Sequence, residues 1–383
     1  MKPSAQHEIY ATKIMGKLKI CLVGSKKPYP AYDSLSSILK EVLGSEQVIE
    51  LRVKGWIVKV PSLLKPLFML LQDVILYLKI LICRKRHKIN AVLIYQGYYP
   101  LTCMGLSLLN LKVLLYIGGS AFRSSYYQKR SFMDIILAFS NIPISEICHK
   151  FSHLIILPSK HMINWLGLEK HVAKIQSAIC IVGPKFFNNF TYNTKYTRRE
   201  KILGYVGSLV ESKGIMNFIQ SISIIKSKHE FQTPNFLIIG DGPLFDYLKA
   251  KITDYRISGN VLMKRFVPHS ILPYYYNSMK LLVLPSYTEG LPSVILEAMA
   301  CGTPVLATLV GAIPYIIRDG EIGFFLKSND PKHIAERIIE LLDKPELLEK
   351  VSVKAYNYVR ENFSYEKTLE AWRKILSELE LSK

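Results

Sequence analysis

Short apolar runs alternate with helical stretches along the whole chain, and this alternation is the feature that most constrains its fold. An apolar run of four or five residues, bounded by glycine, proline or polar residues, is typical of a strand buried on both faces. Strands that alternate with helices form parallel sheets covered by helices, which predicts an α/β protein. The expected strands are residues 19–23, 91–95, 113–117, 154–157, 202–206, 236–239, 281–284 and 304–307.

The length of the chain predicts two domains. A chain of 383 residues exceeds the size at which a single core keeps growing. Residues 183–200 are polar, aromatic and charged without clear periodicity, so we expect a linker there. The N-terminal domain then covers residues 1–182 and the C-terminal domain 201–364, with a final helix at 365–383 that crosses back to the first domain. Two such domains should leave a cleft along the carboxyl ends of their strands.

The positive charge is concentrated in the first half. Residues 1–190 hold 25 basic and 9 acidic residues, a net charge of +16, whereas the remainder has a net charge of +4. A basic half indicates phosphate, nucleic acid or an anionic membrane as partner; the alternative is a solvated lysine-rich surface. Nucleic acid is not expected, because no RNA-binding fingerprint or zinc finger is present.

The cysteines and the N-terminus indicate a reduced, cytoplasmic protein without a metal. Six dispersed cysteines form no paired spacing, so we expect reduced core residues. Cys148, His149 and His153 form the one cluster of metal-binding residue types, but no second ligand pair accompanies it. Residues 1–16 lack the apolar segment of a secretion signal. We therefore expect no metal and a location at the inner face of the membrane.

Residues 63–83 are apolar and long enough to span a membrane. Spanning is disfavoured, because a charge at mid-span costs on the order of 3 kcal/mol and Asp73 lies there. On a helix, polar residues spaced seven apart form one narrow stripe beside a wide apolar face. This stripe comprises Lys65, Gln72 and Lys79. The basic cluster 84–88 follows, which suits a helix in the membrane interface. A helix buried against a sheet is the alternative, and both hold if the helix is partly covered.

The expected strand 202–206 ends in a turn suited to phosphate. Gly207 permits close approach to the backbone, the next helix N-terminus favours negative charge, and Lys213 supplies a cation. Alone this pattern has low specificity, because strand–glycine–helix turns are common in α/β proteins.

Two carboxylates surround a second helix start. Pro292 fits the first turn of this helix and Gly302 the position just past its end. Glu289 precedes the helix and Glu297 lies within it, where burial without hydrogen-bond donors is unfavourable. Both carboxylates can accept hydrogen bonds from sugar or ribose hydroxyls. In the alternative interpretation, Glu289 caps the helix and Glu297 lies on the surface.

With these residues, the second half resembles the group 1 retaining glycosyltransferases of the GT-B fold. The resemblance lies in the Glu-x7-Glu pattern of Glu289 and Glu297 within residues 284–308, and extends through 204–326. It implies two Rossmann-like domains facing each other across a cleft. It also implies transfer of a hexose from a nucleotide-diphosphate sugar with retention of configuration, and no essential metal or other cofactor.

The resemblance also assigns roles to individual residues. It implies that Glu297 holds the ribose, that Glu289 contacts the donor sugar, and that Lys213 and the Gly207 backbone bind the diphosphate. Lys213 and Glu289 are the expected catalytic residues. The expected donor-binding residues are Gly207, Ser208, Lys213, Val267, Glu289, Gly290, Leu291, Pro292, Ser293 and Glu297. The acceptor side is expected at Gly118, Gly119 and Ser120.

Departures from the family pattern leave two hypotheses. Ser208 stands where the family has a second cationic residue that contacts the diphosphate, so stabilisation of the leaving group is weaker unless Arg265 reaches the diphosphate instead. Ala121 stands where an acidic residue is usual. The first hypothesis is a transferase acting on a glycan or lipid-linked acceptor at an anionic membrane. The second is a nucleotide-sugar-binding scaffold with weak or no turnover.

Overall fold

The computed structural model describes residues 18–25, 30–53, 64–119, 132–179, 186, 196, 199–200, 202–228 and 234–381. The chain divides into two compact units. Unit 1 comprises Met1–Ile181 and Glu366–Lys383, and unit 2 comprises Val182–Tyr365. The sequence predicted that the first domain ends at residue 182, the linker at residue 200 and the second domain at residue 364. Phe186, Tyr196 and Arg199, which fall in the expected linker, are buried within unit 2.

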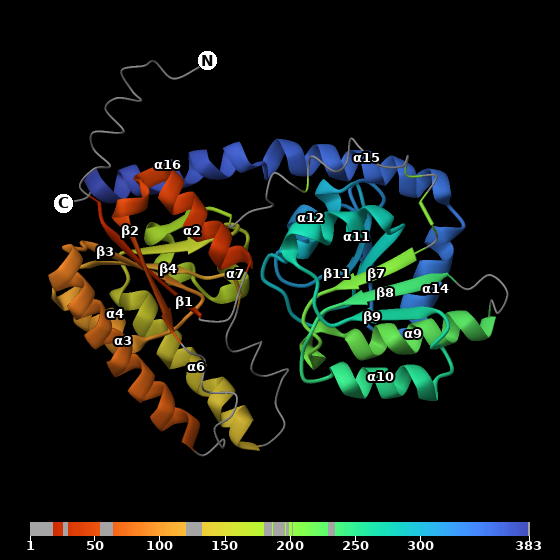
Figure 1. Cartoon of the computed structure of the whole chain (residues 1–383), viewed down its shortest axis with the longest axis horizontal. Coiled ribbons are helices and arrows are strands. Elements are labelled where there is room, and N and C mark those ends of the chain that lie inside the picture. Colours follow the sequence, from red (N-terminus) through yellow and green to blue (C-terminus); the bar gives the residue numbers. More distant parts are fainter. Residues whose placement is uncertain are drawn as a thin grey trace. The chain divides into compact units, whose positions relative to one another are not determined.

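Unit 1 contains a parallel six-stranded sheet in the order β2-β1-β3-β4-β5-β6. Its strands are β1 (Ile20–Ser25), β2 (Val48–Val53), β3 (Ala91–Tyr95), β4 (Lys112–Tyr116), β5 (Leu154–Leu157) and β6 (Ile175–Ser177). Its helices are α2 (Pro30–Leu43), η1 (Ser45–Gln47), α3 (Lys65–His87), α4 (Pro100–Leu108), α6 (Phe132–Phe151), α7 (Met162–Leu166), η4 (Glu169–Lys174) and α16 (Tyr365–Leu381). Helices α3, α4 and α6 lie side by side on the sheet (Figure 1).

The last helix, α16, packs on unit 1. Trp372 is fully buried, stacks on Tyr116 with ring centroids 6.3 Å apart, and donates a hydrogen bond to the carbonyl of Ile179 at 3.2 Å. Lys112 donates to the carbonyl of Leu379 near the end of the helix. The apolar face of α16 thus completes the core of a unit that begins more than 300 residues earlier in the sequence.

Unit 2 contains a second parallel sheet in the order β12-β11-β10-β7-β8-β9. Its strands are β7 (Ile202–Val206), β8 (Asn235–Ile239), β9 (Val261–Lys264), β10 (Leu281–Leu284), β11 (Val305–Thr308) and β12 (Phe324–Leu326). Its longer helices are α9 (Ile215–Lys228), α10 (Phe245–Asp254), α12 (Ser293–Ala300), α14 (Pro331–Leu342) and α15 (Pro345–Asn362). Its short helices are η6 (Glu211–Lys213), η7 (His269–Ile271), α11 (Leu272–Ser278) and α13 (Ile313–Ile316).

The strand order of unit 2 is that of a Rossmann fold, in which the chain builds outward from β7 in one direction and then from β10 in the other. Helices α9 and α10 cover one face of the sheet, and α11 and α12 cover the other (Figure 1). The strand order reverses between β7 and β10, and ligands of open parallel sheets usually bind outside the carboxyl ends of the strands at such a reversal. The predicted α/β class with two Rossmann-like sheets is confirmed.

All eight strands expected from the sequence are present, with ends that differ by at most two residues. The strand expected at 304–307 begins one residue later, at Val305, because Pro304 has no N–H to donate to a ladder.

Candidate functional site

The predicted donor residues gather at the carboxyl edge of the second sheet, where the crossover reverses. The loop after β7 carries Gly207 and Ser208 and leads into η6, which ends at Lys213. The loop after β10 carries Glu289 and leads into α12. Since β7 and β10 are neighbours in the sheet, the two loops lie side by side.

These two loops are packed so closely that a side chain is excluded at their junction. Gly214 has a φ of +64°, and a Cβ atom there would lie 1.9 Å from the carbonyl oxygen of Pro285. The N–H of Tyr287 donates to the carbonyl of Ser212 at 2.9 Å. Glycine is therefore required at position 214 both by its conformation and by the close approach of the β10 loop.

Lys213 and Glu289 form an ion pair across this junction. The Nζ atom of Lys213 lies 2.7 Å from Oε2 of Glu289, whose side chain is 7% exposed. The second oxygen of Glu289, Oε1, accepts a hydrogen bond from the hydroxyl of the buried Ser286 at 2.7 Å. The carboxylate is thus fixed on both oxygens, while the lysine side chain remains 27% exposed. A cation in this position can contact an anion that enters between the loops.

The loop after β11 packs against the backbone of Glu289 and Gly290. Gly311 has a φ of +60°, and a Cβ atom there would lie 2.0 Å from the carbonyl oxygen of Glu289. The N–H of Ala312 donates to the carbonyl of Gly290 at 2.9 Å. Three neighbouring strands therefore position the residues around Glu289.

Glu297 is buried inside α12, with a hydrogen-bond donor on each oxygen. Its Oε1 lies 3.1 Å from Nε2 of His269, and its Oε2 accepts the hydroxyl of Tyr276 at 2.9 Å. Burial, and then the charge of Glu297, raise the pKa of Tyr276 well above its usual value, so the phenol remains a donor. A carboxylate has about four lone-pair sites, so Glu297 retains capacity for a ligand hydroxyl. The alternative of a surface carboxylate at Glu297 is wrong.

The start of α12 differs slightly from the expected one. Pro292 precedes the first turn as the capping residue instead of lying within that turn, and no side chain caps the helix, so Glu289 is not a cap. Pro292 is buried, whereas Gly290, Leu291 and Ser293 are half-buried. The helix ends as predicted before Gly302, which has a φ of +64°.

The remaining donor residues lie at the same edge of the sheet. The N–H of Gly207 donates to the carbonyl of Ile239 at 3.0 Å, so this group is already used by the sheet. Ser208 is exposed. After β9, Phe266 is 76% exposed and Val267 is half-buried.

Arg265 does not substitute for the missing second cation in this structure. Its Nη1 lies 2.9 Å from Oδ1 of Asp241 and its Nη2 lies 3.1 Å from Oδ1 of Asp246. Its guanidinium also lies 3.8 Å from the ring centroid of Phe245. Two carboxylates and an aromatic ring therefore hold Arg265 at the start of α10.

The predicted acceptor residues belong to unit 1. Gly118 and Gly119 follow β4 at the carboxyl edge of the first sheet, whereas Ser120 lies outside the described residues. A Cβ atom on Gly118 would lie 2.3 Å from Nε2 of Gln96, which follows the neighbouring strand β3. The loops after β3 and β4 are therefore in close contact at this edge.

Three residues of the site were not identified from the sequence: His269, Tyr276 and Ser286. Each donates to, or lies within hydrogen-bond distance of, a predicted carboxylate. The requirement that a buried Glu297 has donors was visible in the sequence, but the donors come from residues up to 28 positions away. Only Ser286, three residues before Glu289, lies near its partner in the sequence.

Comparisons with known proteins identify a family that residues 191–358 resemble. Residues 191–358 match the family model described as glycosyl transferases group 1. CapM, a capsular polysaccharide biosynthesis glycosyltransferase of Staphylococcus aureus, is 35% identical over 167 residues, which is 43% of this chain and 42% of CapM. The chain spans about half the length of the curated relatives that it matches.

Two solved structures resemble the whole chain. Sucrose-phosphate synthase from Thermosynechococcus elongatus has a TM-score of 0.74 at 16% identity, and the match covers 96% of this chain and 100% of the synthase chain. Anabaena HepE, in complex with UDP, has a TM-score of 0.71 at 15% identity and covers 94% of this chain and 100% of its own. At this identity the likeness shows the fold, and it confirms the predicted GT-B class. Residues 191–358 of this chain thus match the group 1 glycosyltransferases in sequence.

Proposed function

We propose that this protein is a glycosyltransferase that moves a hexose from a nucleotide-diphosphate sugar to an acceptor. The observation that carries the proposal is the Lys213–Glu289 ion pair at the crossover reversal of unit 2, beside the buried Glu297. The family match over residues 191–358 supports it. The UDP complex of HepE supports a uridine nucleotide as the first donor to test.

The chemistry follows from the charges of these residues. The bond between the anomeric carbon and the diphosphate oxygen breaks, and negative charge grows on the leaving diphosphate. Lys213 and the N-terminus of α12 stabilise that charge, which lowers the barrier because the interaction strengthens in the transition state. The acceptor hydroxyl forms the new bond on the face that the diphosphate leaves, and its proton passes to a diphosphate oxygen. This route retains the anomeric configuration and uses no metal.

The carboxylates position the donor. Glu297 accepts hydrogen bonds from the ribose hydroxyls, and Glu289 accepts one from a hydroxyl of the sugar. Because His269 and Tyr276 fix both oxygens of Glu297, the ribose meets an acceptor that is already oriented.

A screen across UDP-, GDP- and ADP-sugars tests the reaction, with release of the nucleoside diphosphate measured in the presence of membrane lipid extracts and oligosaccharides. We expect one donor to give release that depends on acceptor, and chromatography of the product to show a retained anomer. Binding of a donor without any release would instead support a scaffold. The exposed Ser208 and the ion-paired Arg265 favour that second candidate, because neither of these two residues supplies a second cation beside Lys213 at the diphosphate.

We further propose that the acceptor is lipid-linked and that unit 1 lies on an anionic membrane at the inner face. Helix α3 is the described helix that is long and apolar enough to cross a membrane, with a mean hydropathy of 1.9 and 17% of its most apolar window buried. Its large exposed side chains fall within an arc of about 140°. They are Leu67, Leu70, Leu71, Val74, Ile75, Leu78 and Ile82.

The opposite face of α3 is anchored in unit 1. Asp73, at the middle of the helix, is buried and accepts hydrogen bonds from the N–H groups of Leu101 and Thr102 at 2.8 and 2.9 Å. The hydroxyl of Thr102 donates to the same carboxylate at 2.6 Å. Asp73 thus satisfies the first turn of α4, so the charge that would oppose membrane contact faces the protein. The helix is partly covered, as the sequence allowed.

Basic residues continue from the apolar face. Arg84, Lys85, Arg86, His87 and Lys88 end α3, and all but the half-buried Arg84 are exposed. An apolar face that ends in cations suits the boundary between acyl chains and anionic headgroups. Sedimentation with phosphatidylglycerol-containing vesicles at low salt should deplete the protein from solution, whereas phosphatidylcholine vesicles should bind less. A protein that stays wholly in solution with both vesicle types would exclude this location.

A further inference from the structure

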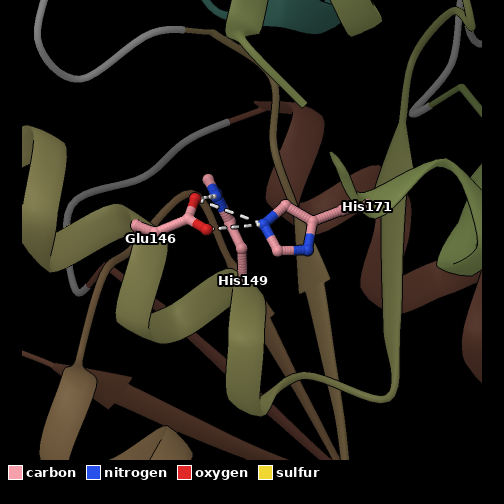
Figure 2. Close-up of side chains that lie close together, drawn as sticks. All are labelled: Glu146, His149 and His171. Carbon is pink, nitrogen blue, oxygen red and sulfur yellow. Dashed lines mark hydrogen bonds and ion pairs between the residues drawn. The ribbon is translucent and has the colours of Figure 1, made fainter. Parts of the chain in front are cut away.

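A glutamate and two histidines of unit 1 meet at a place that the proposed reaction does not use. Glu146 and His149 are one turn apart on α6, and His171 lies on η4. Nε2 of His171 lies 3.1 and 3.2 Å from the two oxygens of Glu146, and Nδ1 of His149 lies 3.9 Å from Oε2 of Glu146 (Figure 2). The three ligand atoms all lie within 4.8 Å of one another.

His149 lacks the hydrogen bonds that a buried imidazole requires. The residue is 5% exposed, and its Nε2 has no partner among the described residues. Its Nδ1 faces Glu146 at 3.9 Å, which is beyond hydrogen-bond distance. A buried imidazole nitrogen left without a partner costs on the order of 1–3 kcal/mol, and an ion bound at Nδ1, the nitrogen that faces Glu146, would satisfy one of the two nitrogens.

We propose that Glu146, His149 and His171 bind one divalent transition-metal ion of the zinc class. Imidazole nitrogens and a carboxylate oxygen are the donors that such ions prefer. Bonds of about 2.0–2.1 Å in a tetrahedron place neighbouring ligand atoms roughly 3.3 Å apart. Two of the three separations are 3.1 and 3.9 Å and the third is at most 4.8 Å, so side-chain rotations would bring the ligand atoms to this spacing.

The surroundings of the cluster are compatible with a cation. The ammonium group of Lys174 donates to the carbonyl oxygens of His149, Lys150 and Ser152 at 2.9–3.0 Å, so it is bound by the C-terminus of α6. The side chain of Glu146 is 53% exposed, which leaves solvent access for the ion and for a water as fourth ligand.

The position of the cluster indicates a structural role. Helix α6 leads into β5 and η4 leads into β6, so the three residues lie near the amino ends of these strands. Ligands of parallel α/β sheets bind at the opposite, carboxyl edge. A metal here would join α6 to η4 and stabilise unit 1 without contacting the sugar donor.

Cobalt and zinc titrations of the full-length protein, purified without a histidine tag and treated with chelator, test the site. One equivalent of Co²⁺ should give the visible absorption bands of a tetrahedral site. Zn²⁺ should displace the Co²⁺ and raise the melting temperature of the protein. Glu146→Gln, which keeps the size of a half-exposed side chain, should weaken Co²⁺ binding by about 10-fold or more. Glu169→Gln removes an exposed charge on η4 and should bind Co²⁺ as the unaltered protein does.

The outcomes separate a metal site from a simple hydrogen-bonded cluster. The proposal is supported if the metal-free Glu146→Gln protein has the circular dichroism spectrum of a folded protein and fails to give the absorption bands when Co²⁺ is added. Absence of these bands from the unaltered protein at saturating Co²⁺, or equal binding by Glu146→Gln, overturns it. A third outcome is that Glu146→Gln lowers the melting temperature while Zn²⁺ does not change the melting temperature of the unaltered protein. This outcome would assign the cluster to hydrogen bonding alone and overturn the proposal.

Discussion

The Nζ atom of Lys213 lies 2.7 Å from Oε2 of Glu289, and this contact joins the loops that follow two adjacent strands of the second sheet. Lys213 lies at the junction of these loops, and its ion pair with Glu289 holds it there. When a diphosphate enters, Lys213 can exchange one anionic partner for another without crossing the site.

Replacement of Lys213 by alanine should lower the rate of sugar transfer at saturating donor by about 10²-fold, the scale for loss of one transition-state contact. Steady-state release of the nucleoside diphosphate measures this effect. Lys249→Ala, at an exposed position of α10 in the same unit, is the matched control and should keep the original rate. Equal rates in the two variants would remove Lys213 from the proposed mechanism.

Tyr276→Phe should weaken donor binding while leaving the carboxylate of Glu297 in place. The substitution removes the hydroxyl that donates to Oε2 of Glu297 at 2.9 Å. A buried acceptor left without its donor lowers the stability of the folded protein by on the order of 1–3 kcal/mol. We expect a lower melting temperature and a higher KM for the donor. Tyr274→Phe changes a tyrosine on the same helix that is 59% exposed, and it should alter neither quantity. A Tyr276→Phe protein that melts lower but has an unchanged donor KM would show that Tyr276 supports only the fold.

Gly311→Ala should impair the enzyme through the backbone of Glu289. The new Cβ atom would lie 2.0 Å from the Glu289 carbonyl oxygen, and the φ of +60° is unfavourable for alanine. Either the loop after β10 moves or the protein unfolds more readily, so both the transfer rate and the melting temperature should fall. Gly259→Ala is the control, because its Cβ would meet no atom within 4 Å. Normal transfer and stability in Gly311→Ala would contradict the close contact between these loops.

Leu71→Asp combined with Leu78→Asp should abolish sedimentation with phosphatidylglycerol vesicles. Both leucines are about half-exposed on the apolar face of α3, so the substitutions place charge where acyl chains would lie, with little effect on the core. Circular dichroism and melting temperature verify the fold. Leu262→Asp, at a 55% exposed leucine of unit 2, should sediment like the unaltered protein. If all three proteins bind vesicles equally, α3 is not the membrane-binding face.

The accuracy of the sequence-based fold prediction depended on the position of each strand in its sheet. The eight strands predicted from apolar runs are the central ones. The four edge strands, β2, β6, β9 and β12, were not predicted from apolar runs. An edge strand has one neighbour and is less covered, so it lacks a continuous apolar run. In β2, for example, one of the six residues is buried.

The sequence by itself determined the α/β class, the central strands and the Glu-x7-Glu pattern, because these depend on local periodicity and on residues close together in the chain. It also required that a buried Glu297 have donors. Only the tertiary structure decided which residues supply them, since Tyr276 and His269 lie 21 and 28 positions away.

The same distinction applies to the first unit. The sequence grouped His149 with Cys148 and His153, its nearest neighbours, and predicted no metal there. In the structure Nδ1 of His153 accepts the N–H of Val113 at 3.2 Å, and His149 lies beside Glu146 and His171. Such contacts depend on which strands are adjacent and on which face of the sheet each crossover packs. Strand order is a property of the whole chain, and no local pattern encodes it.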